Sequence, residues 1–409
     1  MKPRSPLLPI FLIVLVDILG MTIILPLLPF YAEHYGASPL VVGLLVATYA
    51  ACSLISSPVI GNLSDRYGRR PLLLISQTGT LIGFLVMASA DSLWLVFAAR
   101  ILDGLTAGNL SLAQAYVSDV TRPKDRAKAF GLIGIAFGIG FLIGPAITAW
   151  MSRYGYHYPV LAAAALSATS IVATWFLLPE VPRGGLSPAA GEADDGPAAP
   201  AGRRLGVLEW RGYLEFFRRP VLSRLLVQFF LFAFAFSCFT GGFGMFAERR
   251  FTWHGEPFDA REVGYVFAYV GFLGIILQGG LLGRMVKAVG EGWLITAGFL
   301  SAAVGYAALG YTYSIPMLLV VAAVSSFGSG VLRPALTSRI TQEVGRHEQG
   351  VALGLSQSLS SIAMVIAPIL AGLLIRAHWL LAWALLAAAA SALGFILAAG
   401  TKPGTGSSS

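Results

Sequence analysis

The sequence predicts an all-α membrane protein whose twelve transmembrane helices form two bundles of six. Three observations carry this prediction. Hydrophobic residues make up 56% of the 409-residue chain and charged residues only 12%, whereas soluble domains are about a quarter charged. Apolar segments of membrane-spanning length occur as six, a gap and six, and the two halves share sequence patterns.

The first apolar segment contains Asp17 and continues to about Phe30 without a small-residue cleavage site, so we expect a retained helix instead of a signal peptide. Crossing ~30 Å of hydrocarbon takes about 20 apolar residues, and five more segments of this length follow. These segments define an N-terminal bundle over residues 1–178. Its six predicted helices lie near residues 7–30, 40–62, 72–90, 93–117, 128–151 and 159–178.

The chain then becomes polar over residues 179–221. The stretch GGLSPAAGEADDGPAAPAGRR has the composition of a flexible linker, and VLEWRGYLEFFRR is predicted to lie as an amphipathic helix on the membrane surface. Six further segments define a C-terminal bundle over residues 222–400, and residues 401–409 are predicted to be a disordered tail. The six predicted helices of this half lie near residues 222–247, 263–283, 292–310, 315–339, 350–375 and 379–399.

The net charge of +8 is explained by where the 28 Lys and Arg residues fall. With a cytoplasmic N-terminus, most of them lie in cytoplasmic loops, and Arg153, Arg249, Arg250, Arg261 and Arg376 lie outside. This asymmetry predicts that both termini are cytoplasmic and removes any need for a nucleic-acid partner. The two cysteines fall in apolar segments, so we expect no disulfide, metal site or cofactor.

The two halves of the chain repeat each other in the same orientation. Helix five reads DRAKAFGLIGIAFGIGFLIGPAI and helix eleven reads HEQGVALGLSQSLSSIAMVIAPIL, which aligns Pro145 with Pro368. The loop after helix two has a weaker counterpart, GGLLGRMVKAVG, after helix eight, which aligns Arg66 with Arg284. A parallel repeat is typical of transporters that work by alternating access about a site between the halves.

The loop after predicted helix two, GNLSDRYGRRP, is unusually rich in charge and glycine for this chain. Gly61 is expected to let helix two approach a neighbour closely, and Gly68 to adopt a positive φ in the tight turn. Asp65 lies near the membrane surface, and Arg66 and Arg69 are predicted to reach Asp119 at the end of helix four. The full set of loop residues is Gly61, Asp65, Arg66, Gly68, Arg69, Arg70 and their partner Asp119.

This loop resembles the signature of the major facilitator superfamily in spacing, residue type and position. Across most of the chain the resemblance extends to the twelve-helix drug/proton antiporters, and in particular to the tetracycline–cation/proton antiporter group, through LVDILGMTIILPLLP, SLWLVFAARILDGLTAG, GIAFGIGFLIGP and RHEQGVALGL. The resemblance implies the major facilitator fold, with its halves related by a pseudo-twofold axis. It also implies a monomer in the plasma (bacterial inner) membrane that exchanges protons for small molecules, with this loop latching the cytoplasmic side. The alternative is that the arginines only enforce topology.

Helix five carries closely spaced glycines that resemble the family's antiporter motif. Glycine pairs four residues apart permit close helix contact, and the proline bends the span. Thr148 and Ala149 stand where that motif continues with two glycines, and generic helix packing explains the same residues. The motif residues are Gly134, Gly138, Gly140, Gly144 and Pro145.

Three ionisable residues lie well inside predicted spans: Asp17, Arg100 and Asp103. An unpaired charge there costs on the order of 3 kcal/mol, so we expect these groups to face a cavity or one another. One turn separates Arg100 from Asp103, which permits a local ion pair. The hypothesis is that Asp17 or Asp103 carries the proton; the alternative is a permanent ion pair that joins helix one to helix four.

Amide and aromatic side chains within the spans are candidates for substrate binding, because an apolar pocket with a few amides suits amphipathic molecules. Aromatics of helix seven have the alternative of facing lipid. Arg333 is a candidate to attract an anionic group or to extend to the cytoplasmic surface. The candidates are Asn109, Gln114, Gln228, Phe232, Phe236, Gln278, Arg333 and Gln357.

The resemblance to the tetracycline group is incomplete. It implies an acid in helix three, a histidine in helix eight and an acid in helix nine, where this chain has Gly83, Gly274 and Ala302. The sequence therefore favours a proton-coupled exporter of drug-like or amphipathic molecules other than tetracycline. The alternative within transporters is a proton-coupled symporter or exchanger of small organic anions. Duplication and buried opposite charges disfavour a channel or scaffold, and no motif indicates an enzyme.

Overall fold

The computed structural model describes residues 7–121, 126–179, 215–345 and 348–400. The chain groups into two compact units, which are described separately. Unit 1 comprises residues 1–198 and 258–272, and unit 2 comprises residues 199–257 and 273–409. Most of the predicted linker at 179–221, with its amphipathic segment, and the predicted tail at 401–409 lie outside the described residues. The predicted boundaries of the two bundles therefore stay predictions.

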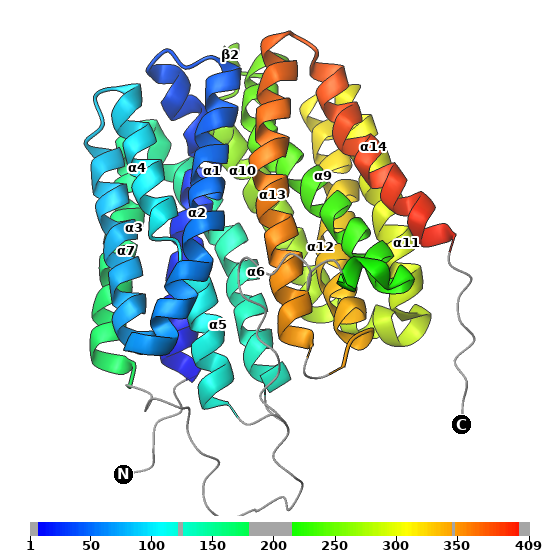
Figure 1. Ribbon diagram of the computed structural model, residues 1–409. Helices are drawn as coiled ribbons and strands as arrows, with labels where there is room; N and C mark the ends of the chain where they lie inside the picture. The colour runs from blue at the N-terminus through cyan, green and yellow to red at the C-terminus, as the bar shows by residue number, and fades with distance from the viewer. Residues whose placement is uncertain (1–6, 122–125, 180–214, 346–347, 401–409) are drawn as a thin grey trace, which may run out of the picture. The chain divides into compact units, whose positions relative to one another are not determined.

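Unit 1 is a bundle of helices that run alongside one another (Figure 1). Pro39 begins the second helix, as expected for a residue that lacks an amide N–H. Gly68, at a φ of 101°, separates the second helix from the third, so the predicted positive φ is confirmed. The elements are α1 Leu7–His34, α2 Pro39–Tyr67, α3 Arg69–Ala88, α4 Leu93–Leu105, α5 Asn109–Val120, α6 Arg126–Met151, a short 3-10 turn Ser152–Tyr154, and α7 His157–Leu177.

Unit 2 is also helical, and its described residues include a short β-hairpin whose two strands, β1 Thr252–Trp253 and β2 Glu256–Pro257, have two residues each. His254 and Gly255 turn the hairpin with φ values of 52° and 89°. The boundary between the units falls within α10, after Phe272, and a π-helical turn, Leu277–Leu281, follows α10 in unit 2. The helices are α9 Pro220–Arg250, α10 Ala260–Ile276, α11 Leu282–Gly310, α12 Ile315–Gln342, α13 Gln349–Arg376 and α14 Leu380–Ala399.

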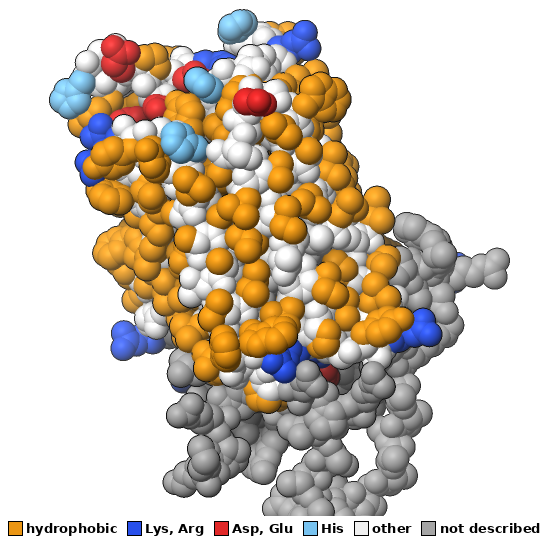
Figure 2. Space-filling model, turned by 90° about the vertical axis from the view of Figure 1, so that its left-hand side faces the viewer, with side chains coloured by type: hydrophobic (Ala, Val, Ile, Leu, Met, Phe, Trp, Pro, Cys, Tyr) orange, Lys and Arg blue, Asp and Glu red, His pale blue; other side chains and the backbone are white. Residues whose placement is uncertain are grey.

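Eleven stretches in the described part of the chain are long and apolar enough to cross a membrane. One of them, Ala260–Gly310, has 51 residues, about 75 Å of helix and more than twice the thickness of a bilayer core. Gly290, with φ 80° and ψ 160°, interrupts it. Divided there, the stretch gives two spans, in agreement with the twelve predicted. The face of unit 1 in Figure 2 is largely hydrophobic and carries its charged side chains at the two ends.

The span predicted near residues 93–117 is confirmed as Leu93–Val117, but it is not one continuous helix, because α4 ends at Leu105 and α5 begins at Asn109. Serines from two neighbouring helices satisfy the freed backbone groups. Ser56 donates to the Gly104 carbonyl at 2.8 Å and Ser57 to the Ala107 carbonyl at 3.0 Å. Ser76 donates to the Thr106 carbonyl and accepts from the Gly108 amide at 3.0 Å. Irregular backbone at membrane depth is tolerated only with such partners.

Two glycines of α6 allow α1 to pack closely against it. A Cβ at Gly140 would collide with Ile18, and one at Gly144 would collide with Thr22. The approach allows Thr22 to donate to the Gly140 carbonyl at 2.9 Å, and Thr148 to donate to the Ile23 carbonyl at 2.6 Å. Of the predicted glycine pairs spaced by four residues, Gly140 and Gly144 therefore make a close helix contact. A Cβ at Gly134 would meet open space.

The first part of α10 groups with unit 1 because it packs against α6. A Cβ at Gly264 would lie 2.7 Å from the Pro145 carbonyl oxygen, and one at Gly271 would collide with the backbone of Phe141. Both glycines face backbone, which cannot move aside as a flexible side chain can. Pro145 of the predicted helix-five motif thus lies at a helix contact that admits only glycine on the partner helix.

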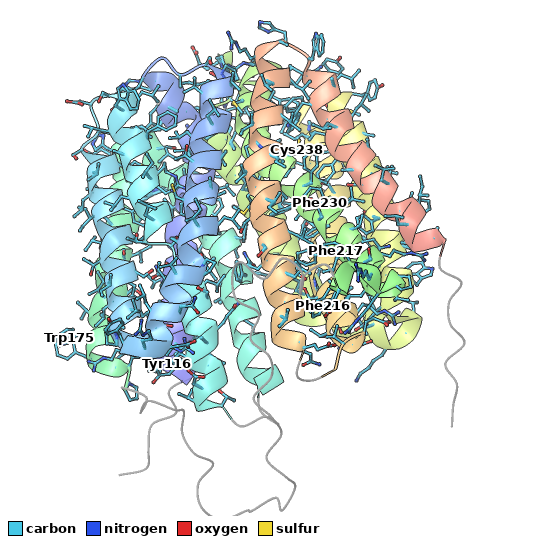
Figure 3. The ribbon with its side chains drawn as sticks, in the orientation of Figure 1. Tyr116, Trp175, Phe216, Phe217, Phe230 and Cys238 are labelled. Carbon is cyan, nitrogen blue, oxygen red and sulfur yellow. The ribbon has the colours of Figure 1, made fainter. Side chains whose placement is uncertain are left out.

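Aromatic packing dominates the core of unit 2. Trp383 of α14 is 1% exposed, and its indole N–H donates to the Cys238 carbonyl on α9 at 3.1 Å. Its ring lies 4.8 Å from that of Phe246. Cys238 is a free, fully buried thiol (Figure 3), and a buried thiol of this kind acts as a small hydrophobe. These contacts join α9 to α14.

Candidate functional site

Arg100 and Asp103 form an ion pair inside α4. The distance from Arg100 Nη1 to Asp103 Oδ2 is 3.0 Å, and both side chains are about nine-tenths buried, with 11% and 10% exposure. The guanidinium also lies 4.3 Å from the centre of the Tyr49 ring on α2, and the Thr80 side chain of α3 interacts with the Asp103 carboxylate. The predicted local pair is therefore confirmed. An ion pair joining helix one to helix four is not formed.

Asp17 of α1 is held by an amide instead of a cation. The Asn109 amide nitrogen donates to Asp17 Oδ1 at 2.5 Å, and Asp17 makes no ion pair with any residue that the structure describes. Asn109 was predicted to bind substrate, but it is the first residue of α5 and is 6% exposed. The break between α4 and α5 places the positive end of the α5 dipole beside the carboxylate. Asp17 and Asp103 are also close enough to repel each other electrostatically.

A small polar cavity lies beside Asp17 among α1, α3 and α7. Its volume is about 10 Å³, and it is lined by Val16, Asp17, Gly20, Gln77, Thr80, Phe84, Ser167 and Ser170. Gln77 is 2% exposed and donates through Nε2 to the Ser170 hydroxyl at 2.8 Å. Its other side-chain atom, Oε1, is buried without a hydrogen-bond partner in the described structure.

Charged residues of the loop between α2 and α3 meet the far end of α5. Arg69 pairs with Asp65 at 2.6 Å and with Asp119 at 2.9 Å, and it donates to the Ser64 hydroxyl at 2.5 Å. We call Asp65, Arg69 and Asp119 the Arg69 cluster. The other predicted partner of Asp119, Arg66, is exposed and makes no ion pair with the described residues. A close approach at Gly61 is also not found, since a Cβ there would meet open space.

Arg70 joins the start of α3 to the end of α7. It donates to the Trp175 carbonyl at 2.5 Å, and its guanidinium lies 5.7 Å from the centre of the Trp175 ring. Trp175 is exposed at the edge of unit 1 (Figure 3). Nearby, the buried Tyr116 hydroxyl of α5 donates to the Pro179 carbonyl at 2.8 Å. These contacts hold the end of α7 against the ends of α3 and α5 that carry Arg69 and Asp119.

Unit 2 has a counterpart of this cluster with a different chemistry. Gly290 breaks α11 with a positive φ, as Gly68 does between α2 and α3. The next residue, Glu291, accepts from the Ser338 hydroxyl at 2.6 Å and from the Gln342 amide at 3.2 Å. Both partners lie near the end of α12. The two loops are therefore equivalent through Gly68 and Gly290, and not through Arg66 and Arg284 as the sequence alignment had placed them.

The remaining substrate-binding candidates are distributed over several helices. Gln228 and Phe232 of α9 are buried, and Phe236 is half-buried and stacks on Phe232 with ring centres 6.0 Å apart. The other four are exposed: Gln114 on α5, Gln278 in the π-helical turn, Arg333 on α12 and Gln357 on α13. Within unit 1 the structure brings only Asn109 of these candidates to the ionisable residues.

A larger cavity, of about 540 Å³, lies at the opposite end of unit 1 from the Arg69 cluster. Tyr31, His34 and Tyr35 at the end of α1 line it, together with Tyr156 and Asp259, whose side chains are hydrogen-bonded at 2.7 Å. Fourteen residues of α1 separate Asp17 from Tyr31, which is about 20 Å of helix. Despite its size, this cavity is separate from the buried ionisable residues.

Several site residues were not predicted, namely Tyr49, Ser76, Gln77, Thr80 and Ser170. One signal was present in the sequence: Ser76 and Gln77 lie four and three residues before Thr80, which places polar groups on one face of an otherwise apolar helix. The described residues contain no cluster of three or more His, Cys, Asp or Glu side chains arranged to hold a metal ion.

Comparisons with known proteins agree with this architecture. Residues 10–286 and 258–407 match the family described as Major Facilitator Superfamily. The class C tetracycline resistance protein of Escherichia coli is 30% identical over 385 residues, which cover 90% of this chain and 89% of that protein. Multidrug resistance protein 2 of Bacillus subtilis (strain 168) is 26% identical, with 89% and 88% covered.

A solved structure shows the same fold. The crystal structure of the human organic anion transporter MFSD10 (TETRAN) superposes with a TM-score of 0.73 at 24% identity, covering 97% of this chain and all of the other. The chain is thus a multi-pass membrane transporter and not an enzyme: it belongs to the major facilitator superfamily and resembles the tetracycline resistance proteins within it.

Proposed function

We propose that this transporter is a proton-coupled antiporter that exports drug-like or amphipathic molecules, with Asp17 as the proton carrier. The observation that carries the proposal is how the ionisable groups inside the spans are paired. Arg100 is neutralised by Asp103, whereas Asp17 is held only by the neutral amide of Asn109. Asp17 is half-buried inside a span, and a carboxylate there without a cation gains most from binding a proton. Asp103 serves to compensate Arg100.

We further propose that α5 transmits the protonation state of Asp17 to the Arg69 cluster. Asn109 at its first turn contacts Asp17, and Asp119 at its last turn contacts Arg69. The helix between them is about 15 Å long and rigid on this scale. Protonation of Asp17 weakens the charge-assisted hydrogen bond from Asn109 and so frees α5 to move at both ends. The Arg69 cluster then acts as a cytoplasmic gate, in a plasma (bacterial inner) membrane with both termini in the cytoplasm.

The packing at Gly83 supports a substrate other than cation-chelated tetracycline. A Cβ at Gly83 would lie 3.2 Å from the Cβ of Asp103 and 3.3 Å from the Ala99 carbonyl oxygen. An acidic side chain on α3 would therefore displace Asp103, so this chain carries its carboxylate on the facing helix. That carboxylate is committed to Arg100 and Thr80, which leaves it poorly placed to bind a metal chelate.

Proton-coupled transport of small organic anions is the alternative. The name of MFSD10 points to this class, and Arg333 is exposed on α12 inside a span. Against it, the one arginine buried among the ionisable residues of unit 1 already has a carboxylate partner. We therefore place anion transport second.

Transport in everted membrane vesicles tests the proposal. With an acid-inside gradient reported by a pH-sensitive dye, addition of ethidium is expected to dissipate the gradient, and tetracycline to do so weakly. Asp17→Asn should abolish the response, while Asp91→Asn, the same change at an exposed loop residue, should leave it intact. Full coupling in Asp17→Asn would overturn the assignment of Asp17. A response only to organic anions such as benzoate would favour the alternative.

A further inference from the structure

We propose that the cavity beside Asp17 binds one water molecule, and that this water together with Thr80 joins Asp17 and Asp103 into a single proton-sharing unit. The inference rests on the proposed function, since it specifies where the transported proton resides. Nothing in the sequence patterns or the similarity to known transporters assigns a role to Gln77 or Thr80.

The size and lining of the cavity fit a single water. Its volume of about 10 Å³ is close to the minimum of ~10–15 Å³ that one water requires, and a buried water needs two to four polar partners. Asp17 offers a carboxylate whose Oδ1 already accepts from Asn109, and Gln77 offers the buried Oε1 that has no partner in the described structure. Ser170 and Thr80 add hydroxyl groups. The lining therefore offers enough hydrogen-bond donors and acceptors for one water, and the cavity is too small for a drug-like molecule.

Thr80 is the link between this cavity and the ion pair. It lines the cavity beside Asp17, and its side chain also interacts with the Asp103 carboxylate. Asp17 and Asp103 sit on different helices and do not touch each other, yet one hydroxyl and one water span the gap. Thr80 is therefore a positioning residue for the proton, not a group that binds substrate.

The proton step conserves every atom. The Asp17 carboxyl O–H bond breaks as its proton passes to the water, the water gives one of its own protons to the Thr80 oxygen, and the Thr80 hydroxyl proton passes to Asp103. Asp17 becomes a carboxylate, Asp103 becomes a carboxylic acid, and the water and Thr80 are unchanged. Arrival of the proton on Asp103 releases Arg100 from its partner.

Other charged groups bias this exchange. Asp103 acts electrostatically on Asp17, and Arg100 acts on Asp103. The Tyr49 side chain is a neutral phenol, and its ring centre lies 4.3 Å from the Arg100 guanidinium. From α3 and α7, the residues that line the cavity contribute amide and hydroxyl groups and no titratable side chain. The exchange is therefore governed by the two carboxylates and Arg100.

Infrared difference spectroscopy of the purified protein tests the proposal without any substrate. A drop in pH is expected to produce an O–H band that shifts in H₂¹⁸O, and carboxyl bands that Asp17→Asn and Asp103→Asn each remove in part. Thr80→Val, which keeps the shape but loses the hydroxyl, should slow the appearance of the Asp103 band at least tenfold. Thr80→Ser should restore the rate. Thr78→Val, the same change at an exposed position of α3, should leave the rate and the water band unchanged.

Absence of an ¹⁸O-sensitive band in the wild-type protein, or an unchanged Asp103 rate in Thr80→Val, would overturn the inference. If Thr80→Val does not fold, as judged by thermal unfolding, Gln77→Leu replaces it and should remove the water band. The outcome is separable from that of the proposed function. If the wild-type protein shows the water band but no antiport, the proposed function is wrong and the relay stands. If Thr80→Val carries out antiport at the full wild-type rate, the relay is wrong and the proposed function stands.

Discussion

Asn109 donates a 2.5 Å hydrogen bond to Asp17, which ties the first residue of α5 to the middle of α1. This contact exists because α4 and α5 are separate helices: a continuous helix would have no N-terminus at this depth. The serines that support the break therefore also support the position of the candidate proton carrier. The arrangement leads to predictions about transport, about stability and about motion.

Asn109→Ala is expected to move the pH profile of transport toward higher pH. A hydrogen bond to a charged acceptor contributes about 1.5–3 kcal/mol, and 1.36 kcal/mol corresponds to one pH unit. Loss of the Asn109 amide should therefore shift the half-maximal pH by about one to two units. The profile is measured in everted vesicles, with Asn62→Ala, the same change at an exposed residue of α2, as the control. A profile that stays in place would show that Asn109 does not stabilise the charged form of Asp17.

Arg100→Gln is expected to destabilise the protein more than the double variant Arg100→Gln/Asp103→Asn. Removing one partner of a buried ion pair costs about 3–5 kcal/mol, because the other charge is left unpaired, whereas removing both costs less. The free energy of unfolding in detergent measures all four members of the cycle. Additive effects would mean that the 3.0 Å pair contributes no coupling energy.

Ser76→Ala is expected to destabilise unit 1 by about 1–3 kcal/mol, the usual cost of an unsatisfied buried polar group. Its hydroxyl hydrogen-bonds both the Thr106 carbonyl and the Gly108 amide, so one substitution leaves a backbone group without this partner on each side of the break between α4 and α5. Ser89→Ala, at an exposed position at the end of α3, provides the matched comparison. Equal melting temperatures for the two variants would contradict this role for Ser76.

Much of the fold could be predicted from the sequence, because span length and apolar composition are local properties. The twelve spans and the positive φ of Gly68 are examples. The Arg100–Asp103 pair was equally accessible, since residues three apart in one helix always lie on the same face. The break at Thr106–Gly108 could not be predicted in this way. It depends on serines from α2 and α3, and which faces of those helices meet α4 is a tertiary property.

The same reason explains the errors at the site. The contact of Asn109 with Asp17 could not be predicted, because it depends on how α5 is rotated toward α1; the assignment of Asn109 to substrate stays a prediction. Arg66 and Arg69 looked equivalent in the loop, yet the turn at Gly68 directs only Arg69 toward Asp119. In unit 2, aligning Arg66 with Arg284 did not point to Glu291. The repeat preserves the glycine turn, but an acidic residue, Glu291, follows Gly290 where the basic Arg69 follows Gly68.

Arg69→Gln is expected to loosen the end of α5. Asp65 and Asp119 lose their shared cation, and two partly exposed carboxylates then face each other. Partly exposed ion pairs contribute about 1 kcal/mol or less each, so amide hydrogen exchange over residues 117–121 should accelerate by about fivefold. Arg66→Gln removes the same charge three residues earlier without touching Asp119, and should change the exchange rate little. Identical rates in the two variants would indicate that the arginines act only through their charge.

Arg219 and Glu348 are expected to form a pH-dependent link between α9 and α13. Arg219 donates two hydrogen bonds of 2.7 Å to the two carboxylate oxygens, and these bonds hold the pKa of Glu348 below its usual value near 4.5. Since the folded pKa is the lower one, the link is complete above about pH 4.5 and is lost as the pH falls through the folded pKa, while Arg219 stays charged. Both side chains are more than one-third exposed, so the link contributes less than about 1 kcal/mol.

Hydrogen exchange at the first turns of α9 and α13, corrected for the intrinsic pH dependence of exchange, measures this effect. Protection should decrease between pH 5 and pH 3 in the wild-type protein and should be low at both values in Glu348→Gln. Glu343→Gln provides the control, because its partner Arg339 lies one turn earlier in α12 and the pair links no two helices. Protection that is independent of pH in the wild-type protein would show that other contacts hold α9 against α13.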